Sequence, residues 1–323
     1  MLVSVVIIGR NEGERLTRCI TSVKEMDFDP EKYEIIYVDS GSTDGSQENA
    51  EKLGARVFEL DTDKPTAAKG RNKGCHEAKA PLLFFLDGDT IVDPGFLTKA
   101  TTFLAEHEDV AAVSGFRKEI HPENSVYNKI LDLEWLHHEG ESQYCGGDTV
   151  MRRDALIEAG GYKEDLIAGE EPELCHRIRK NKWRIFTIAE PMTGHDLNIR
   201  QFSGYWRRNF RSGHACAEVA QLTDGETFGR ESRYNWIQSF VYTGAGLTLI
   251  GFLHFWAIFP ILAGYGLMVA RNMFRNRWRK LPFGTALIYG MHAHLVWFPV
   301  VCGQIQFHWN RMRNRGGRII EYK

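Results

Sequence analysis

The sequence predicts an α/β fold, in which a mostly parallel β-sheet carries helices on both faces, followed by an α-helical, membrane-associated region. Short β-branched runs alternate with stretches of helical periodicity through about the first 200 residues, a pattern typical of parallel, helix-covered sheets. Two later stretches, residues 237–270 and 281–306, contain no Asp, Glu, Lys or Arg. As helices, both are long enough to cross a hydrocarbon core of roughly 30 Å.

The first half of the chain supplies the clearest elements. Strands are predicted at residues 3–8, 34–38, 55–60 and 82–86, and helices at residues 11–24, 46–53 and 67–78. In sheets of this kind, ligands bind at the carboxyl ends of the strands. The polar loops after Ile8, Val38 and Leu86 are therefore expected to share one functional edge.

The second half is less regular. A further strand is predicted at residues 110–114 and a helix at residues 169–180. The start of this helix is marked by Pro172 in the first turn, with Glu170 and Glu171 beside it, where acidic side chains suit the helix dipole.

Composition places the chain among ordinary folded proteins, with 43% hydrophobic and 25% charged residues among 323. Its six cysteines are scattered without a C-x-x-C pair, which argues against a zinc site or a disulfide framework and indicates a reducing compartment. The N-terminus "MLVSVVIIGRNEG" lacks the features of a signal peptide, so we expect the α/β body to stay in the cytoplasm.

Charge is distributed unevenly. Residues 271–323 carry ten basic residues and one acidic residue, so their net charge is +9, whereas the whole chain carries −2. A basic tail on an acidic body suggests contact with anionic phosphates, in lipid or in nucleic acid. Together with the apolar stretches, it favours membrane lipid and no nucleic-acid partner.

The two apolar stretches pose a topological problem. Basic clusters at residues 271–280 and at Arg311, Arg313, Arg315 and Arg318 flank them, and the positive-inside rule would put both clusters on the cytoplasmic side. We therefore hypothesise that residues 237–270 form a re-entrant hairpin bent near Pro260, and that residues 281–306 lie partly in the interface. A pair of long core helices is the alternative. The expected domains are residues 1–200, a linking segment 201–236, and a membrane-associated region 237–323.

Two aspartates, Asp87 and Asp89, follow a predicted buried strand in "FFLDGDT". Asp-Gly after a strand is a common hairpin signal. We expect no partner strand to follow, because Pro94-Gly95-Phe96 opens a helical stretch, and this disfavours the hairpin. Two carboxylates at a strand end can instead converge on a hard cation such as Mg²⁺ or Mn²⁺, which prefers oxygen ligands and substrate phosphates.

Several motifs then occur together in one order: "VSVVIIGRNEGERLTRCITSV", "IIYVDSGSTDGS", "AAKGRNKG", "FFLDGDT", "GGDTVMRRDALIEAGGY" and "GEEPELCHRIRKNKWRI". In this order they resemble the family 2 glycosyltransferases with the GT-A fold, over roughly residues 1–200. The resemblance implies that this domain is a catalytic, nucleotide-sugar-binding domain of hexosyltransferase type. It further implies inverting transfer from a nucleotide-diphosphate sugar with the help of Mn²⁺ or Mg²⁺.

The resemblance assigns roles on the donor side. It implies that Asp89 ligates the metal and that Asp87 reaches toward the ribose or the metal shell. It also implies nucleotide contacts for Asn11, Glu12 and Asp39, although Gly9-Arg10 replaces the aromatic residue that usually precedes Asn-Glu.

Several donor-side residues also allow a purely structural interpretation. Asp39 can instead form an Asx-turn, and Asp44 either contacts the nucleotide or caps the next helix. Arg71 is either a phosphate or base clamp or part of a solvated helix face. His195 is either a metal ligand or a structural residue.

The general base must be a carboxylate near the anomeric carbon of the sugar. "GEEPELC" resembles the family's Glu-Asp motif, whose second acid is the base, so the resemblance points to Glu171. Because a Glu replaces the usual Asp, Glu170 remains open, as does a purely structural role of both acids at the helix N-terminus.

Acceptor contacts are expected from two segments. Gly146, Gly147 and Asp148 look like the family's acceptor-side loop. Further on, Trp206, Arg207, Arg208 and Arg211 either form an aromatic and basic ledge under a lipid phosphate or belong to an ordinary amphipathic helix. The segment that begins at Gln201 departs from the Q-x-x-R-W of processive members, which disfavours a processive synthase.

The leading interpretation is a bacterial-type transferase of the inner membrane, with its catalytic domain facing the cytoplasm. It would extend a polyprenyl-linked saccharide in the assembly of an exopolysaccharide. One alternative is a polyprenyl-phosphate sugar transferase, whose acceptor is the lipid phosphate. A more distant alternative, a sugar-phosphate nucleotidyltransferase, would show G-G-x-G-T-R-L after the first strand, where this chain has "GRNEGERL". A non-catalytic scaffold would not need Asp39, Asp87, Asp89 and Glu171 together. The oligomeric state is not readable from the sequence.

Overall fold

A computed structural model describes residues 1–135 and 138–313. The described chain divides into two compact units, Met1–Arg200 and the helices from Gln201 onward. Arg315 and Arg318 of the basic tail lie outside the described residues.

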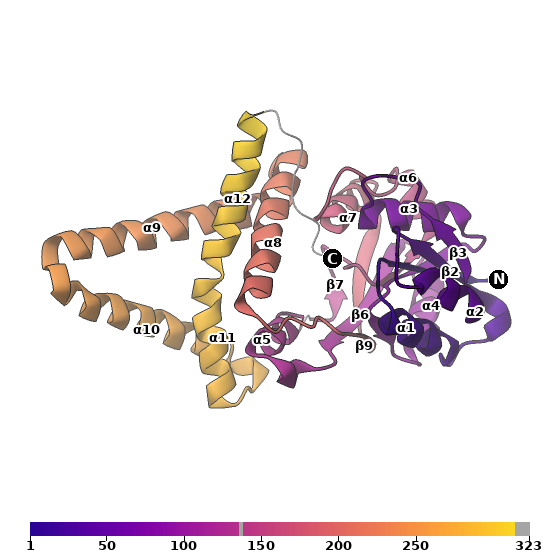
Figure 1. The fold of residues 1–323 in the computed structure, drawn as a ribbon, viewed down its shortest axis with the longest axis horizontal. Helices are drawn as coiled ribbons and strands as arrows, with labels where there is room; N and C mark the ends of the chain where they lie inside the picture. Colours follow the sequence, from indigo (N-terminus) through magenta and orange to yellow (C-terminus); the bar gives the residue numbers. More distant parts are fainter. Residues whose placement is uncertain (136–137, 314–323) are drawn as a thin grey trace. The chain divides into compact units, whose positions relative to one another are not determined.

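The first half of the α/β unit is a parallel sheet with the strand order β3-β2-β1-β4 (Figure 1). Its strands are β1 (Val3–Gly9), β2 (Tyr33–Asp39), β3 (Arg56–Glu59) and β4 (Leu82–Asp87). The helices between them are α1 (Glu14–Lys24), α2 (Ser46–Lys52) and α3 (Ala67–Glu77). Gly9 is in register with Asp39, and Ile8 with Asp87, so the carboxyl ends of β1, β2 and β4 meet at one edge as predicted.

The second half makes the sheet mixed. From β4 the order continues β8-β6-β9-β5, in which β6–β9 is parallel and the other three pairs are antiparallel. The strands are β5 (Thr90–Val92), β6 (Val110–Glu119), β7 (Gly140–Glu141), β8 (Thr149–Arg152) and β9 (Arg184–His195). The helices are α4 (Phe96–Glu106), α5 (Val126–Glu134), α6 (Arg153–Glu158) and α7 (Glu170–Lys180). The predicted α/β class is confirmed, and its parallel character is concentrated in the first half.

Helices cover both faces of the sheet because the strands are apolar on both sides. Along β1, Val5 and Ile7 enter one buried cluster with residues of α1, α2 and α4. The intervening Val6 and Ile8 enter a second cluster with residues of α3, α6 and α7. Side chains of a strand alternate between faces, so a continuous apolar run such as residues 5–8 needs cover on both faces.

The strand after Asp89 corrects one expectation. Thr90–Val92 forms β5, so a strand does follow the two aspartates. It pairs antiparallel with β9, Thr90 opposite His195, and not with β4, so the hairpin is not formed. Its three residues are too few to give a periodicity signal, and its partner lies about a hundred residues away in sequence.

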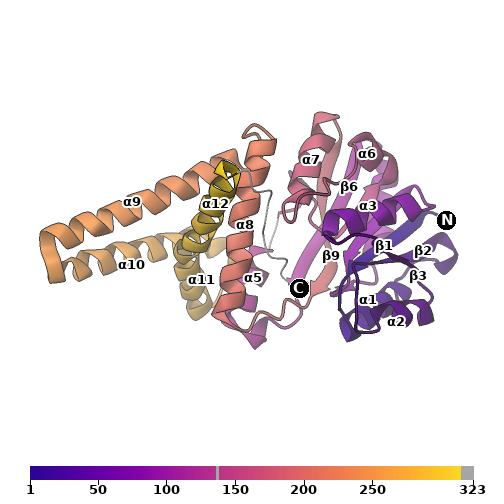
Figure 2. The same cartoon turned by 45° about the horizontal axis from the view of Figure 1, so that its top comes forward.

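The second unit is entirely helical in its described residues (Figure 2). It contains α8 (Phe202–Leu222), α9 (Gly229–Leu253), α10 (Ile258–Arg275), α11 (Phe283–Leu295) and α12 (Trp297–Met312). The chain reverses between α9 and α10 at the short 3₁₀ turn His254–Ala257, just before the predicted bend at Pro260. Pro260 lies in the first turn of α10, where a backbone N–H has no partner within the helix, so proline is tolerated there.

Two glycines allow α8 and α12 to cross closely. A methyl group added at Gly213 would overlap the backbone oxygen of Val300, and one added at Gly303 would overlap the backbone oxygen of Phe210. The backbones of the two helices are therefore in contact at this crossing.

Gly303→Ala should destabilise the helical unit by about 1–3 kcal/mol, because overpacking forces the two backbones apart. Thermal unfolding of the detergent-solubilised protein would show this as a lower midpoint. Gly251→Ala is the matched control, since a methyl group there meets no atom within 4 Å among the described residues. Equal midpoints for the two variants would contradict the close crossing.

Candidate active site

The first loop of the functional edge is anchored by Asp39. This fully buried carboxylate accepts hydrogen bonds from the backbone N–H groups of Gly41 (2.9 Å) and Ser42 (2.7 Å). It also accepts from the side chains of Tyr37 (2.7 Å), Ser42 (2.5 Å) and Gln47 (2.9 Å). Burial raises the pKa of Asp39, but these hydrogen bonds outweigh it, so the pKa lies below its usual value.

Five donors saturate a carboxylate, which offers about four lone-pair positions. The structure therefore shows Asp39 in the turn-forming role that the sequence left as an alternative. A direct contact with a nucleotide would require breaking this network.

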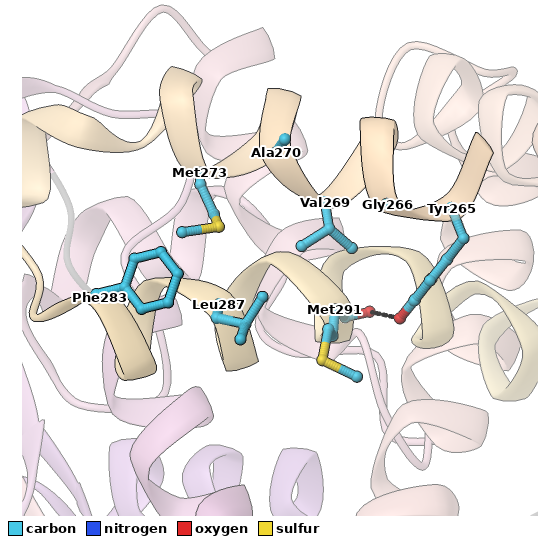
Figure 3. Close-up of a pocket in the computed structure, with 8 residues that line it drawn as sticks. All are labelled: Tyr265, Gly266, Val269, Ala270, Met273, Phe283, Leu287 and Met291. Carbon is cyan, nitrogen blue, oxygen red and sulfur yellow. Dashed lines mark hydrogen bonds between the residues drawn. The ribbon is translucent and has the colours of Figure 1, made fainter. Parts of the chain in front are cut away.

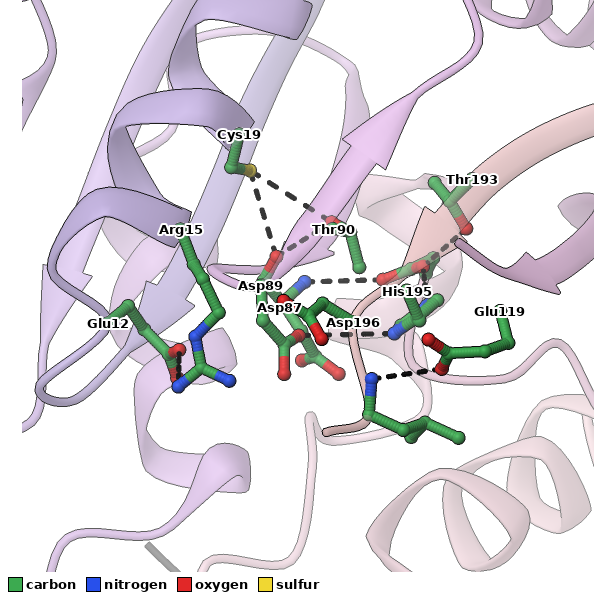
Figure 4. Close-up of polar contacts among 12 residues, drawn as sticks. Glu12, Arg15, Cys19, Asp87, Asp89, Thr90, Glu119, Thr193, His195 and Asp196 are labelled. Carbon is green, nitrogen blue, oxygen red and sulfur yellow. Dashed lines mark hydrogen bonds and ion pairs between the residues drawn. The ribbon is translucent and has the colours of Figure 1, made fainter. Parts of the chain in front are cut away.

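Two neighbouring loops are joined across the edge. The exposed Asn11 accepts a hydrogen bond from Thr43 N at 2.8 Å, and its own backbone N–H donates to Ser42 Oγ at 2.8 Å. Asp44 accepts from Ser46 N (3.1 Å) and Ser46 Oγ (2.6 Å) just before α2, whose N-cap residue is Gly45. Glu12 is buried and forms an ion pair with Arg15 at 2.8 Å (Figure 4).

Arg71 is a buried residue of the site and does not lie on a solvated helix face. From α3, its Nη2 donates to Asp87 Oδ1 and its Nη1 to Glu170 Oε1, both at 2.9 Å. One guanidinium therefore fixes a carboxylate after β4 and a carboxylate at the start of α7. Burial lowers the pKa of Arg71, but these acids outweigh it and keep the group charged.

Asp87, Asp89 and His195 converge at the junction of β4, β5 and β9 (Figure 4). One ligand atom from each lies within 4.8 Å of the others, and His195 Nδ1 is 3.9 Å from Asp89 Oδ1. Gly88 lies between the two aspartates, and its N–H donates to Ile8 O at 2.8 Å. A Cβ atom at this position would lie 3.2 Å from the same oxygen, so the close approach favours glycine.

Asp148 contacts His195 at Nε2, the ring nitrogen on the other side from the Nδ1 that lies nearest Asp89. Its fully buried carboxylate is 2.6 Å from His195 Nε2, and it also accepts hydrogen bonds from Thr193 Oγ1 (2.7 Å) and Asp87 N (3.2 Å). Burial raises the pKa of Asp148, but the adjacent imidazole outweighs it and holds the pKa at about 2. Burial lowers the pKa of His195, but the Asp148 carboxylate raises it above its usual value. Direct acceptor contact, expected for Asp148 from the sequence, is not available to a carboxylate with no exposed surface.

These residues fit a hard divalent cation. Two carboxylates and an imidazole suit Mn²⁺ or Mg²⁺, and metal-binding histidines commonly hold a carboxylate on their other ring nitrogen, as His195 does with Asp148. A second group of possible ligands, Cys145, Glu171 and Cys175, offers two thiols that suit softer cations. Donor chemistry therefore favours the Asp87–Asp89–His195 group.

Asp148→Asn should weaken Mn²⁺ binding about 10- to 100-fold, the usual effect of losing a carboxylate that orients a ligating histidine. Isothermal titration of the protein with Mn²⁺ would measure it. Asp109→Asn, at a surface ion pair with Arg184, is the control. Unchanged affinity in Asp148→Asn would show that Asp148 does not orient a metal ligand.

The two candidate bases differ in their contacts. Glu170 is held by Arg71, as described above. Glu171 is 9% exposed and accepts hydrogen bonds from Cys145 N (2.7 Å) and Cys175 Sγ (3.0 Å), both on Oε1. The two acids begin α7, after Gly169 in a left-handed conformation.

The loop 145–148 lies against the metal-binding group. A side chain at Gly147 would come within 2.9 Å of Arg71 Nη2 and 3.4 Å of Asp87 Oδ2. Gly146 has φ +79°, and a methyl group added there would come within 3.0 Å of the guanidinium of Arg117. Both glycines are required by close approach, so this loop covers the carboxylates at the end of β4.

Sequence reasoning missed Arg117 and Trp135, which lie beside this loop and beside His195. Neither belongs to a motif, and Arg117 comes near Asp148 through long-range pairing of β6 with β8 and with β9, where Arg117 is in register with Thr193. Trp206, Arg207, Arg208 and Arg211 all lie on α8, in the helical unit.

Comparison with known proteins identifies the chain. Residues 4–158 match the model of glycosyl transferase family 2. Residues 4–158 therefore form a family 2 glycosyltransferase domain. Membership implies a nucleotide-sugar donor and excludes the nucleotidyltransferase alternative.

Relatives of this glycosyltransferase occur in archaea and bacteria. Glycosyltransferase AglE of Haloferax volcanii is 25% identical over 232 residues, covering 68% of this chain and 74% of that protein. Succinoglycan biosynthesis protein ExoA of Rhizobium meliloti is 23% identical over 323 residues, covering 91% and 92%. Some other relatives are longer, and the chain spans 34% of their length.

A solved structure confirms the GT-A fold. Mannosyltransferase PcManGT from Pyrobaculum calidifontis, in complex with GDP-Man and Mn²⁺, matches with a TM-score of 0.62 at 16% identity. The match covers 96% of this glycosyltransferase and 87% of that chain.

Proposed function

We propose that this glycosyltransferase moves a sugar from a nucleotide-diphosphate sugar to a hydroxyl of a lipid-linked saccharide, with inversion, during polysaccharide assembly. The observation that carries the proposal is the convergence of Asp87, Asp89 and His195 beside the two acids that begin α7. Similarity to ExoA, a protein of succinoglycan biosynthesis, along most of both chains supports the polysaccharide setting.

The donor diphosphate would bind at the Asp87–Asp89–His195 group. A divalent cation held there would neutralise the charge that develops on the leaving nucleoside diphosphate. Arg71 holds Asp87 through an ion pair, and Asp148 holds His195 through a hydrogen bond. These contacts orient the expected metal ligands before the donor binds. Preorganised ligands lose little conformational freedom on binding.

Glu171 is the proposed general base. Glu170 is less suited, because its carboxylate is held in an ion pair with the buried guanidinium of Arg71, at 2.9 Å. Both hydrogen bonds of Glu171 described above end on Oε1, so neither occupies Oε2. In this role Oε2 would accept the proton of the acceptor hydroxyl as the oxygen attacks the anomeric carbon.

The acceptor is proposed to be a polyprenyl-linked lipid because the helical unit is apolar on its outside. In the most apolar part of Gly229–Arg275, 6% of the residues are buried in the structure. Phe252 is 84% exposed, Phe255 79% and Leu267 72%, which would be unfavourable in water. Gly229–Arg275 and a second segment, Phe283–Met312, are long and apolar enough to cross a membrane, and both favour association with one. So does a pocket of about 440 Å³ with a mostly apolar lining between α10 and α11 (Figure 3).

The hairpin formed by α9 and α10 suggests how the protein is oriented in a membrane. Because α9 and α10 meet at the turn His254–Ala257 and diverge from it (Figure 1), the start of α9 and the end of α10 both lie away from the hairpin tip. Arg230 and Arg233 belong to the first of these ends, and Arg271 and Arg275 to the second. With basic residues on the cytoplasmic side, the hairpin tip would point into the inner membrane and the catalytic unit would stay in the cytoplasm.

A donor screen tests the proposal. Purified protein with Mn²⁺ is incubated with different nucleotide-sugars, and nucleoside diphosphate release is measured with and without a bacterial lipid extract. Stimulation by extract lipids that carry a saccharide supports the proposal. Stimulation by polyprenyl phosphate alone would instead indicate a polyprenyl-phosphate sugar transferase, and no release with any donor would contradict both.

A further inference from the structure

Arg117 is a cation of the site that the scheme above does not use. It lies on β6, in register with Thr193 of β9, two residues before His195. Its Cζ is 5.7 Å from the ring centroid of Trp135, whose ring lies 5.1 Å from that of His195. On its other side the guanidinium packs against Gly146, where a methyl group would come within 3.0 Å. Arg117 therefore touches the acceptor-side loop and the aromatic neighbour of His195.

The guanidinium has no anionic partner in residues 1–135 and 138–313, since none of their carboxylates forms a hydrogen bond or ion pair with it. Two other arginines of this unit differ. Arg71 binds two carboxylates, and so does Arg184. Arg117 is half-buried and still close enough to Asp148 to lower the pKa of that carboxyl. A half-buried cation with five N–H donors and no carboxylate partner among the described residues can bind an anion from solution.

The strand order indicates which substrate supplies the anion. Asp39 ends β2, Asp87 ends β4, and Asp148 precedes β8. Arg117 lies on β6, which is separated from β1 in the sheet by β4 and β8. If the nucleoside binds over β1 and β2 and its diphosphate at the end of β4, the next strands along the sheet face the acceptor. Arg117 then lies beyond Asp87, on the side of the sheet away from the nucleoside.

We propose that Arg117, held in place by Trp135, binds an anionic group of the acceptor, a phosphate or a sugar carboxylate. Rigid packing between Trp135 and Gly146 would keep the planar guanidinium ready for a bidentate contact. This inference rests on the proposed function, because it needs an acceptor that reaches the Asp87–Asp89–His195 group.

The test compares Arg117→Gln and Arg117→Lys with the unchanged protein. Release of nucleoside diphosphate is measured against the amount of bacterial lipid extract, and nucleoside diphosphate binding is measured separately by titration. Arg117→Gln should raise the half-saturating amount of extract about 10- to 100-fold, as expected for losing a hydrogen bond to a charged group. It should leave nucleoside diphosphate binding unchanged. Arg117→Lys should recover part of the loss, because it keeps the charge without the planar fork.

Controls separate the possible failures. Arg184→Gln removes a cation from an exposed ion pair on β9 and should behave like the unchanged protein. Phenyl phosphate and glucuronate, added as competitors of the extract, distinguish a phosphate from a carboxylate, and the effective one should lose its effect in Arg117→Gln. Weaker nucleoside diphosphate binding in Arg117→Gln would make it a donor residue and overturn the inference. An unchanged extract dependence would also overturn it, whereas no stimulation of the unchanged protein would overturn the proposed function itself.

Discussion

Asp89→Asn should reduce sugar transfer at least about 10³-fold, because it removes a carboxylate ligand from the group that holds the donor diphosphate. Charge stabilisation by a bound cation contributes several kcal/mol, and each 1.4 kcal/mol changes a rate about tenfold. Mn²⁺ binding should weaken in parallel. Titration with Mn²⁺ and a turnover assay at saturating donor would measure the two effects on the same preparation.

Asp93→Asn is a suitable control for Asp89→Asn. Asp93 lies four residues further along the same segment, and its side chain accepts a hydrogen bond from Gly95 N at 3.1 Å. The control should retain both Mn²⁺ binding and turnover. Normal Mn²⁺ affinity in Asp89→Asn would remove Asp89 from the metal site, even if turnover fell.

Glu171→Gln should lower the turnover number about 10²- to 10⁴-fold, the range expected for loss of a general base. The amide can still accept the hydrogen bonds from Cys145 N and Cys175 Sγ, so the loop and α7 should keep their positions. Binding of the nucleotide-sugar should therefore be preserved. Turnover measured together with donor affinity tests both statements.

Glu170→Gln serves as the comparison. It weakens one of the two ion pairs of Arg71 and leaves the other, to Asp87, in place. Its loss of turnover should be smaller than that of Glu171→Gln. The reverse order of the two effects would assign the base to Glu170.

The first half of the fold was predictable because its central strands are short, buried and rich in apolar residues. Residues 5–8 and 82–86 are continuous apolar runs, and such runs form central strands that need helices on both faces. Parallel pairing then aligned the ends of β1, β2 and β4, so the edge that carries Asp39 and Asp87 followed from the pattern alone.

The second half was less predictable because long-range pairing decides it. β5 is three residues long and takes its partner from β9, and β8 inserts antiparallel between β4 and β6. These pairings bring Asp148, Thr193 and Arg117 to His195, and no local motif marks them. Burial of Asp148 and saturation of Asp39 by five donors are likewise properties of the assembled loops.

The reversal of the apolar stretch at residues 237–270 was predicted near Pro260 and occurs at His254–Ala257. Proline is compatible with the first turn of a helix, so it marks the start of α10 and not the turn itself. That this hairpin enters a membrane is part of the proposed function.

The central claim is that Asp87, Asp89 and His195 hold a divalent cation against the donor diphosphate. Crystals grown with Mn²⁺ and a nucleoside diphosphate, measured at the manganese absorption edge, test it most directly. The account predicts an anomalous peak bonded to Asp89 and to Nδ1 of His195, with the diphosphate on its open side. A peak at Cys145, Glu171 and Cys175 instead, or nucleotide bound with no peak beside Asp89, would contradict it.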